Sequence, residues 1–142
     1  MSERLPNTTA PNTTAPIVTA AVLDAVLILV FVLIGRRNHE EALALGGIAQ
    51  TAWPFLVGAT AGWLATRAWR SPFGLWPTGT VIWAATVGGG MLLRVASGQG
   101  VQLAFVIVAA LTLAAMLLGW RLVALFVTRR STRTNRVETD AA

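Results

Sequence analysis

The sequence has no cysteine, a single histidine and few charges, and each shortage excludes a class of chemistry. Without cysteine the chain can form neither a disulfide framework nor a thiolate metal site. His39 is the only histidine, which excludes a metal site built from several histidines. The sequence patterns of nucleotide-binding loops, zinc proteases and serine hydrolases are also missing. The sequence therefore predicts no catalytic residue, no metal site and no cofactor.

Charged residues make up 12% of the 142 residues and hydrophobic residues 55%, and the mean hydropathy is +0.65. A soluble domain carries roughly 25% charged residues. Four apolar segments have the length needed to cross a bilayer as a helix, at residues 17–34, 48–66, 79–97 and 101–127. We therefore expect an all-α membrane protein with four transmembrane helices in an antiparallel bundle, placed in the inner (plasma) membrane.

Polar segments flank the apolar part of the chain. Residues 1–16 contain the repeat PNTTA twice and have little to bury, and residues 129–142 are polar and basic. We expect both to be disordered cytoplasmic tails around a transmembrane domain at residues 17–128. The first helix is expected to begin near Pro16, a residue suited to the first turn, and to end near Gly35.

The second helix has two possible starting points. Asn38 followed by Glu41 has the spacing of a capping box, which predicts a helix from about residue 39 with Pro54 in its middle, where proline bends a helix. Alternatively, Thr51 is the N-cap and Pro54 lies in the first turn. We favour the longer, kinked helix.

The arginines predict the orientation of the bundle. With four spans, the side that holds the termini carries Arg4, Arg67, Arg70, Arg121, Arg129, Arg130, Arg133 and Arg136, and the other side carries Arg36, Arg37 and Arg94. Because positive residues concentrate on the cytoplasmic side, both termini are expected in the cytoplasm. The net charge of +5 then reflects membrane anchoring, so the expected partner is the lipid bilayer and not nucleic acid.

Small residues recur within the apolar segments at positions where two helices could approach closely. Helix association in lipid depends on such close approach, because the hydrophobic effect contributes little there. The expected contact residues are Gly58, Gly62, Gly88, Gly89, Gly90, Ala115 and Gly119. For the three consecutive glycines, a hinge or a backbone that faces a substrate is the alternative interpretation.

Asp24 interrupts the first apolar segment. It lies seven residues after Ile17, and Arg121 lies seven residues before Thr128, so both are about 10 Å inside the same membrane face. An unpaired charge there is costly, so we expect an ion pair between Asp24 and Arg121, with Arg67 as the alternative partner. Such a pair either fixes the helices in register or provides a carboxylate that takes up a proton during transport.

A second polar group is expected at the opposite, outer end of the bundle. It consists of Arg36, His39, Glu40, Glu41 and Arg94. Arg94 is expected to reach Glu40 or Glu41, or to meet an anionic headgroup or solute. Solvated side chains at the helix ends are the alternative interpretation.

Three stretches, LDAVLILVFVLIGRRNHEE, TAWPFLVGATAGW and GGGMLLRVASG, resemble a family of small prokaryotic membrane proteins known as domain of unknown function 3054. The resemblance covers roughly residues 17–128. It implies a four-helix membrane fold and brings no established activity. The lysine-free, arginine- and alanine-rich composition is similar to that of proteins from high-GC bacteria.

Three functions fit these features. The first is a small transporter or an accessory subunit in which Asp24 carries a proton or contacts a solute. The second is a non-catalytic structural or scaffold module. The third is an interfacial enzyme acting on lipids, with His39, Glu40 and Glu41 as acid and base. One bundle of this size is thin, so a homo-oligomer or a larger membrane complex is expected.

Overall fold

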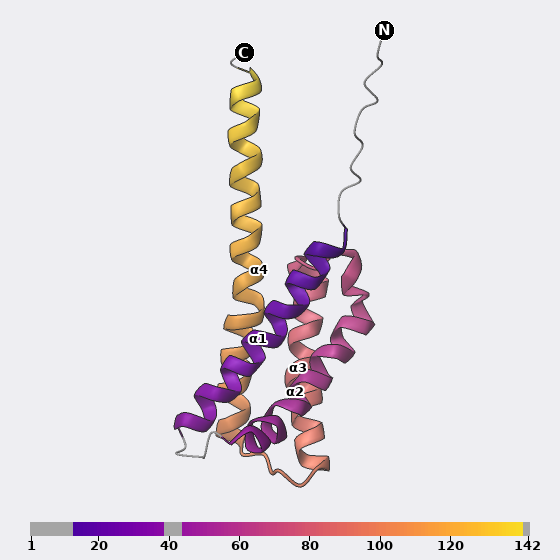
Figure 1. The fold of residues 1–142 in the computed structure, drawn as a ribbon, viewed down its shortest axis with the longest axis vertical. Helices are drawn as coiled ribbons and strands as arrows, with labels where there is room; N and C mark the ends of the chain where they lie inside the picture. Colours follow the sequence, from indigo (N-terminus) through magenta and orange to yellow (C-terminus); the bar gives the residue numbers. More distant parts are fainter. Residues whose placement is uncertain (1–12, 39–43, 141–142) are drawn as a thin grey trace.

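The computed structural model describes residues 13–38 and 44–140, and the side chains of residues 13–37 and 44–130. Over these residues the chain forms an antiparallel bundle of four α-helices and no strand (Figure 1). The helices are α1 (Thr14–Asn38), α2 (Leu45–Thr66), α3 (Thr80–Ala96) and α4 (Leu103–Asp140). A 3₁₀ turn (Ala68–Arg70) and a π turn (Leu75–Gly79) connect α2 to α3. The predicted all-α fold is confirmed.

Three helical segments are long and apolar enough to cross a membrane: Thr14–Arg37, Leu75–Ala96 and Leu103–Arg130. The helix α2 is not among them, because glycine, threonine, Gln50 and Pro54 lower its hydropathy. It makes its most extensive contacts with α3. The structure thus supports three of the four predicted spans, and a membrane crossing by α2 stays a prediction.

The helix α1 begins at Thr14, two residues before the predicted start. Pro16 fits there because the first N–H groups of a helix have no partner within it. The helix continues past Gly35 to Asn38, so Asn38 is not the N-cap of the next helix and the predicted capping box is wrong. Residues 39–43, including His39, Glu40 and Glu41, lie outside the described residues, as do residues 1–12 of the predicted N-terminal tail.

Both predicted starts of the second helix are wrong, because α2 begins at Leu45 after an extended Ala44. Thr51 lies inside this helix, where its hydroxyl donates to the Gly47 carbonyl at 2.9 Å. Pro54 therefore lies in the middle of α2, where its missing N–H leaves the Gln50 carbonyl without the usual helical partner. The first turns of α2 point in a different direction from the rest of the helix (Figure 1).

The C-terminal helix is longer than predicted. The helix α4 continues to Asp140, past the end predicted at residue 127, and projects beyond the rest of the bundle (Figure 1). Neither glycine nor proline follows Gly119, so the sequence contains no strong signal to end the helix. Residues 129–140, which were predicted to be disordered, are therefore part of a helix in the structure.

Small residues of α2 face α3 at close range. A Cβ added at Gly58 would approach the Ala85 carbonyl oxygen to 2.5 Å, and one added at Gly62 would approach the Ile82 Cα to 2.7 Å. Gly89 lies against the backbone of Gly58. This is the close backbone approach that membrane helices use to associate.

The glycine at position 90 has a different role, since it leaves room for the ring of Phe55. A Cβ at Gly88 or Gly119 would meet nothing within 4 Å in the described part of the chain, and Ala115 is exposed, so none of the three supports a close helix contact there. The three consecutive glycines therefore face three different surroundings.

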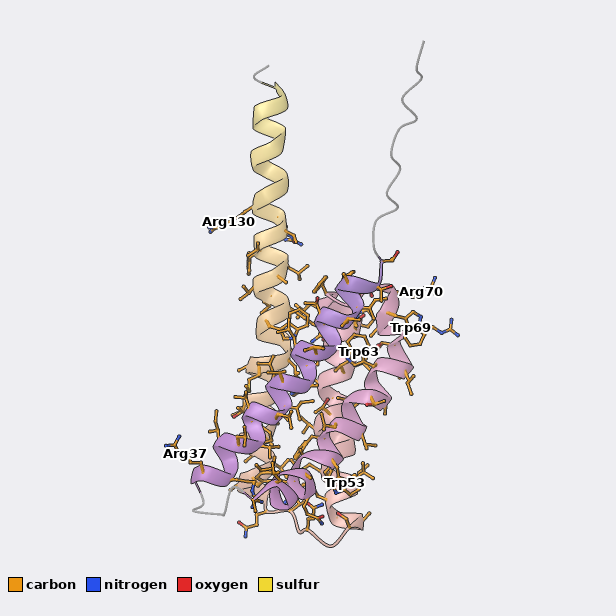
Figure 2. The ribbon with its side chains drawn as sticks, in the orientation of Figure 1. Arg37, Trp53, Trp63, Trp69, Arg70 and Arg130 are labelled. Carbon is orange, nitrogen blue, oxygen red and sulfur yellow. The ribbon has the colours of Figure 1, made fainter. Side chains whose placement is uncertain are left out.

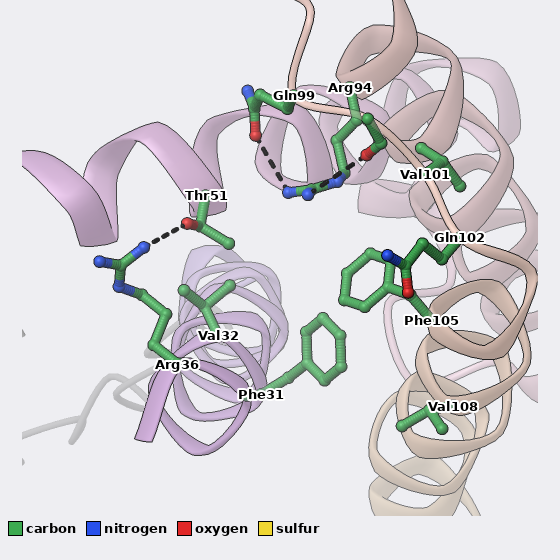
Figure 3. A pocket seen from close by; sticks show the side chains of 12 residues that line it. Phe31, Val32, Arg36, Thr51, Arg94, Gln99, Val101, Gln102, Phe105 and Val108 are labelled. Carbon is green, nitrogen blue, oxygen red and sulfur yellow. Dashed lines mark hydrogen bonds between the residues drawn. The ribbon is translucent and has the colours of Figure 1, made fainter. Parts of the chain in front are cut away.

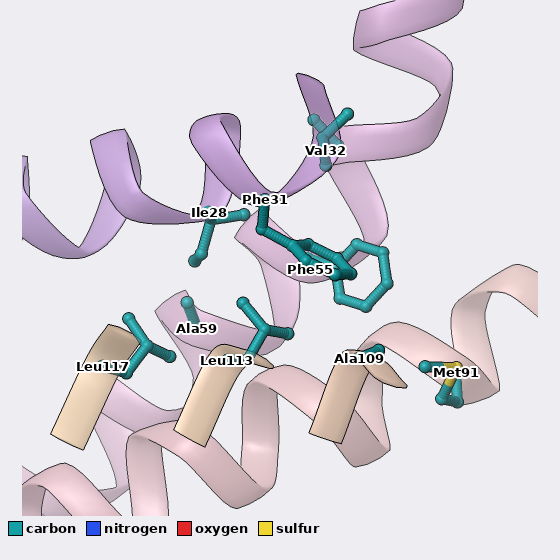
Figure 4. Close-up of a cluster of buried hydrophobic side chains, with 10 residues drawn as sticks. Ile28, Phe31, Val32, Phe55, Ala59, Met91, Ala109, Leu113 and Leu117 are labelled. Atoms are coloured by element: carbon teal, nitrogen blue, oxygen red, sulfur yellow. The ribbon is translucent and has the colours of Figure 1, made fainter. Parts of the chain in front are cut away.

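A core of buried side chains joins all four helices (Figure 4). Its aromatic part is formed by the buried Phe31 of α1 and Phe55 of α2, with the partly buried Phe105 of α4 packed against them, and the ring centroids are 5.5 to 6.4 Å apart. The aliphatic part includes Ile28, Leu113 and Leu117. This core lies between two polar sites, one toward each end of the bundle.

Candidate functional site

Asp24 and Arg121 occupy positions in the sequence that would otherwise be apolar core. Buried side chains recur on α1 and on α4 at intervals of four residues, which places each set on one helix face. These residues are Ala20, Asp24, Ile28 and Val32 on α1, and Ala109, Leu113, Leu117 and Arg121 on α4. The two sets of residues face each other in the bundle, so Asp24 on α1 meets Arg121 on α4.

The two side chains form a bidentate ion pair. Arg121 donates through Nη1 to Asp24 Oδ1 at 2.8 Å and through Nη2 to Asp24 Oδ2 at 2.7 Å. Asp24 is 2% exposed and Arg121 is 0% exposed. The planar guanidinium matches both carboxylate oxygens at once, which gives this kind of pair its geometric specificity. Arg67, the alternative partner, is exposed at the C-terminal end of α2.

Two tryptophans complete the coordination of the carboxylate. Trp63 of α2 donates from Nε1 to Asp24 Oδ2, and Trp120 of α4 donates from Nε1 to Oδ1, each at 2.9 Å. A carboxylate offers about four acceptor positions, and Asp24 receives four N–H groups. We call these four residues, Asp24, Trp63, Trp120 and Arg121, the Asp24 clamp. It joins α1, α2 and α4.

Further contacts hold the arginine of the clamp in place. Its Nη1 also donates to the Leu117 carbonyl at 2.9 Å, and its Cζ lies 4.4 Å from the centroid of the Trp120 ring. Gly79, just before α3, makes room for this side chain, since a Cβ there would lie 2.8 Å from Arg121 Cδ. Phe73 packs edge-on against Trp120 with the ring centroids 5.7 Å apart. The connection from α2 to α3 thus covers the clamp.

A second polar site lies at the other end of the bundle, where Arg36 and Arg94 line one cavity of about 580 Å³ (Figure 3). Arg36 donates to the Thr51 hydroxyl at 3.0 Å, and Arg94 donates to Gln99 Oε1 at 3.0 Å. The structure therefore brings together two residues of the predicted outer cluster. The other three, His39, Glu40 and Glu41, lie outside the described residues.

Charged and aromatic side chains mark both ends of the bundle. Arg70 and Trp69 lie at one end, Arg130 lies farther out on α4 in the same direction, and Arg37 lies at the opposite end (Figure 2). Trp69 and Arg70 are both exposed. Between these ends the exposed surface of the helices is largely apolar. This distribution is typical of a chain whose middle is surrounded by hydrocarbon.

A family model described as protein of unknown function (DUF3054) matches residues 21–124. This chain belongs to the DUF3054 family. The match confirms the resemblance noted in the sequence, and it covers the four residues of the Asp24 clamp as well as Arg36 and Arg94. No curated protein and no solved structure matches this DUF3054 chain. Its function must therefore be argued from its own residues.

Sequence reasoning on this DUF3054 chain missed both tryptophans of the clamp. A signal existed for each. Trp63 lies four residues after the buried Ala59, on the face that α2 turns toward α1, and Trp120 directly precedes the predicted arginine. An indole N–H inside hydrocarbon needs an acceptor, and Asp24 is the only acidic residue within the apolar segments.

Proposed function

We propose that this protein is a multi-pass plasma-membrane protein with both termini in the cytoplasm, and that it works as a non-catalytic membrane module. Apolar helices that are long enough to span support the membrane location. The orientation is supported by eight arginines on the side of the termini against three on the other. Four spans with this orientation require α2 to cross the membrane as well.

The hydrogen bonding of Asp24 carries the assignment of a structural role. Both carboxylate oxygens already accept two N–H groups each, from Arg121 and from two tryptophans. A proton carrier must exchange its proton with a changing partner, whereas these four donors come from residues of α2 and α4 that pack within the bundle. The arrangement favours a carboxylate that stays bonded to Arg121 and to the two tryptophans and so holds three helices together.

A transporter with Asp24 as proton carrier is the competing function, and one substitution separates the two. Asp24→Asn removes the titratable group and keeps the volume of the side chain. We expect this variant, reconstituted in liposomes with an internal pH dye, to conduct protons at the same rate as the wild type. We also expect it to unfold at a lower denaturant concentration in detergent. A wild-type proton flux that disappears in the variant would overturn the structural assignment.

The module is proposed to work as a homo-oligomer or as a subunit of a larger complex. Gly88 and Gly119 support this proposal, because a Cβ at either would meet nothing within 4 Å in the described part of the chain and membrane helices associate through such small residues. Light scattering of the purified protein with detergent subtraction measures the number of chains per particle. A particle that contains one chain at all concentrations, together with a pull-down that recovers no partner, would contradict it.

The third hypothesis, an interfacial enzyme, depends on His39, Glu40 and Glu41. These residues lie outside the described part of the chain, so this function stays a prediction. It requires that His39→Ala abolish activity toward lipid, whereas the proposed module tolerates this change.

A further inference from the structure

A groove between α1 and α2 lies beside the Asp24 clamp. Its volume is about 290 Å³, and small side chains of both helices line much of it: Ala21 and Ala25 on α1, and Ala59 and Thr60 on α2. Thr60 is exposed, so the groove opens on the outside of the bundle. We propose that it holds one acyl chain of an anionic phospholipid whose headgroup is bound by Arg67. This inference rests on the proposed location of the bundle, α2 included, in a membrane.

The polar side chains that line the groove are already bonded within the protein. Asp24 accepts four N–H groups, and one of them is the indole N–H of Trp63. The Thr60 hydroxyl donates to the Leu56 carbonyl at 2.8 Å. The remaining lining side chains are aliphatic. A polar ligand would lose its hydrogen bonds to water in the groove without replacing them, so the groove fits a hydrocarbon chain.

The size of the groove distinguishes an acyl chain from a helix of a second copy. One turn of an α-helix, with a diameter of about 10 Å and a pitch of about 5.4 Å, fills roughly 420 Å³. This is more than the volume of about 290 Å³ that the groove offers. A whole helical turn therefore does not fit inside, whereas a flexible hydrocarbon chain does.

Arg67 provides a positive charge at one end of the groove. It follows Trp63, the last residue of α2 that lines the groove, by four residues, which is about 6 Å along a helix axis. Its side chain is exposed and forms no hydrogen bond or ion pair with the described residues. The only acidic side chain that the structure describes is Asp24, which is bonded in the clamp. The guanidinium of Arg67 is thus available to a phosphate from outside the chain.

The surroundings of Arg67 also fit the level of lipid headgroups. Its φ angle of 49° is a left-handed conformation that ends α2, and glycine is the usual residue in this conformation at a helix end. An arginine here costs some strain, which favours a role for its side chain. Trp69 and Trp76 are both exposed on the connection that follows, and Trp69 lies at this end of the bundle (Figure 2). Tryptophan is enriched at headgroup level.

The first test counts bound lipids by native mass spectrometry of the full-length protein. The micelles contain equal amounts of phosphatidylglycerol and phosphatidylcholine, and we expect each chain to retain one phosphatidylglycerol. Arg67→Gln should weaken this retention about fivefold, which is about 1 kcal/mol, the contribution of one arginine near an anionic lipid surface. Arg70→Gln is the matched control, because Arg70 lies on the turn that leads to α3 and does not line the groove. We expect it to change retention by less than about twofold.

A pair of alanine substitutions tests the groove itself. A leucine in place of Ala25 occupies the space of the acyl chain, whereas Ala61 is an exposed residue of α2 that does not line the groove. We expect Ala25→Leu to weaken phosphatidylglycerol retention at least about tenfold, because each CH₂ displaced from the groove contributes about fourfold. We expect Ala61→Leu to leave retention unchanged. Circular dichroism in micelles without phospholipid checks that both variants keep their helices.

Glycerol phosphate separates a lipid from a free anion, because it carries the charged headgroup without an acyl chain. We expect it not to displace phosphatidylglycerol from the wild-type protein. Displacement would mean that the anion alone is recognised, and it would overturn the role of the groove. This measurement needs no substitution, so it tests the groove even if Ala25→Leu does not fold.

Three further outcomes would overturn the lipid site. Equal losses from Arg67→Gln and Arg70→Gln, or equal retention of phosphatidylcholine, would indicate a general attraction to lipid. Unchanged lipid retention in Ala25→Leu, with fewer chains per particle, would assign the groove to a second copy. A protein that needs detergent for extraction yet retains no phosphatidylglycerol would remove the lipid site and leave the proposed membrane location intact. A protein that is extracted without detergent would instead contradict the proposed location.

Discussion

The Asp24–Arg121 pair can be tested by a double-mutant cycle in which Asp24→Asn and Arg121→Met are made singly and together. Each single change leaves one buried charge without its partner. For Arg121→Met the carboxylate keeps only the two indole N–H groups, and for Asp24→Asn the guanidinium loses its counter-charge. Removing one partner of a buried pair costs about 3–5 kcal/mol. We expect each single variant to lose that much unfolding free energy.

The double variant is expected to be more stable than the sum of the single changes predicts. It leaves no buried charge, and the amide oxygen introduced at position 24 can still accept from Trp63 or Trp120. Coupling energies between contacting residues reach about 3 kcal/mol, and a desolvated pair with two parallel N–H···O bonds belongs at the upper end of that range. We therefore expect a coupling of about 2–3 kcal/mol.

The assay is equilibrium unfolding in mild detergent by titration with sodium dodecyl sulfate, followed by tryptophan emission and by circular dichroism. Arg70→Met is the control for the loss of an arginine, because Arg70 is exposed on the connection after α2. We expect it to change the unfolding free energy by less than about 0.5 kcal/mol. Single-variant effects that add within about 0.5 kcal/mol in the double variant would refute the paired arrangement.

Three further changes test other parts of the site and the topology. Gly79→Ala forces a Cβ toward Arg121 and should cost about 1–3 kcal/mol in the same titration, whereas Gly46→Ala, whose Cβ meets nothing within 4 Å, should leave stability equal or higher by up to about 1 kcal/mol. Trp63→Phe removes one N–H donor from an ionised oxygen and should cost about 1.5–3 kcal/mol; a loss below about 0.5 kcal/mol would contradict its role. Because the chain has no cysteine, a single cysteine replacing Gln99 should react with an impermeant maleimide on intact cells, while one at the last residue should react only after permeabilisation; the reverse pattern would invert the proposed orientation.

The sequence predicted the meeting of Asp24 and Arg121 for a simple physical reason. A charge inside an apolar span needs a counter-charge at the same depth, and depth can be counted along a helix at about 1.5 Å per residue. Depth alone does not determine how each helix is rotated about its axis, and the structure adds this rotation. That rotation brings in Trp63 and Trp120 and leaves Arg67 outside.

The helix boundaries were harder to predict than the helices themselves. Between Gly35 and Thr51 several residues can cap a helix, and local signals do not decide among them. The helix α2 begins at Leu45 without a side-chain cap, so no capping pattern could have located it. The end of α4 was misplaced for a different reason. The polar composition of residues 129–142 predicted disorder, but no residue there stops the helix before Asp140.

The polar residue in α1 has a consequence for the whole bundle. From Ala20 to Gly35 every residue of this helix except Asp24 is apolar. Hydrophobicity alone therefore does not determine which face of α1 turns toward the other helices and which toward lipid. Asp24 distinguishes them, because only one rotation of α1 brings its carboxylate to Arg121 and the two indoles. Residues at four-residue intervals from it, Ala20, Ile28 and Val32, are then buried, as is Phe31. The same rotation carries Phe31 to the wall of the cavity that Arg36 and Arg94 line, so the clamp at one end of α1 determines which of its side chains line the cavity at the other end.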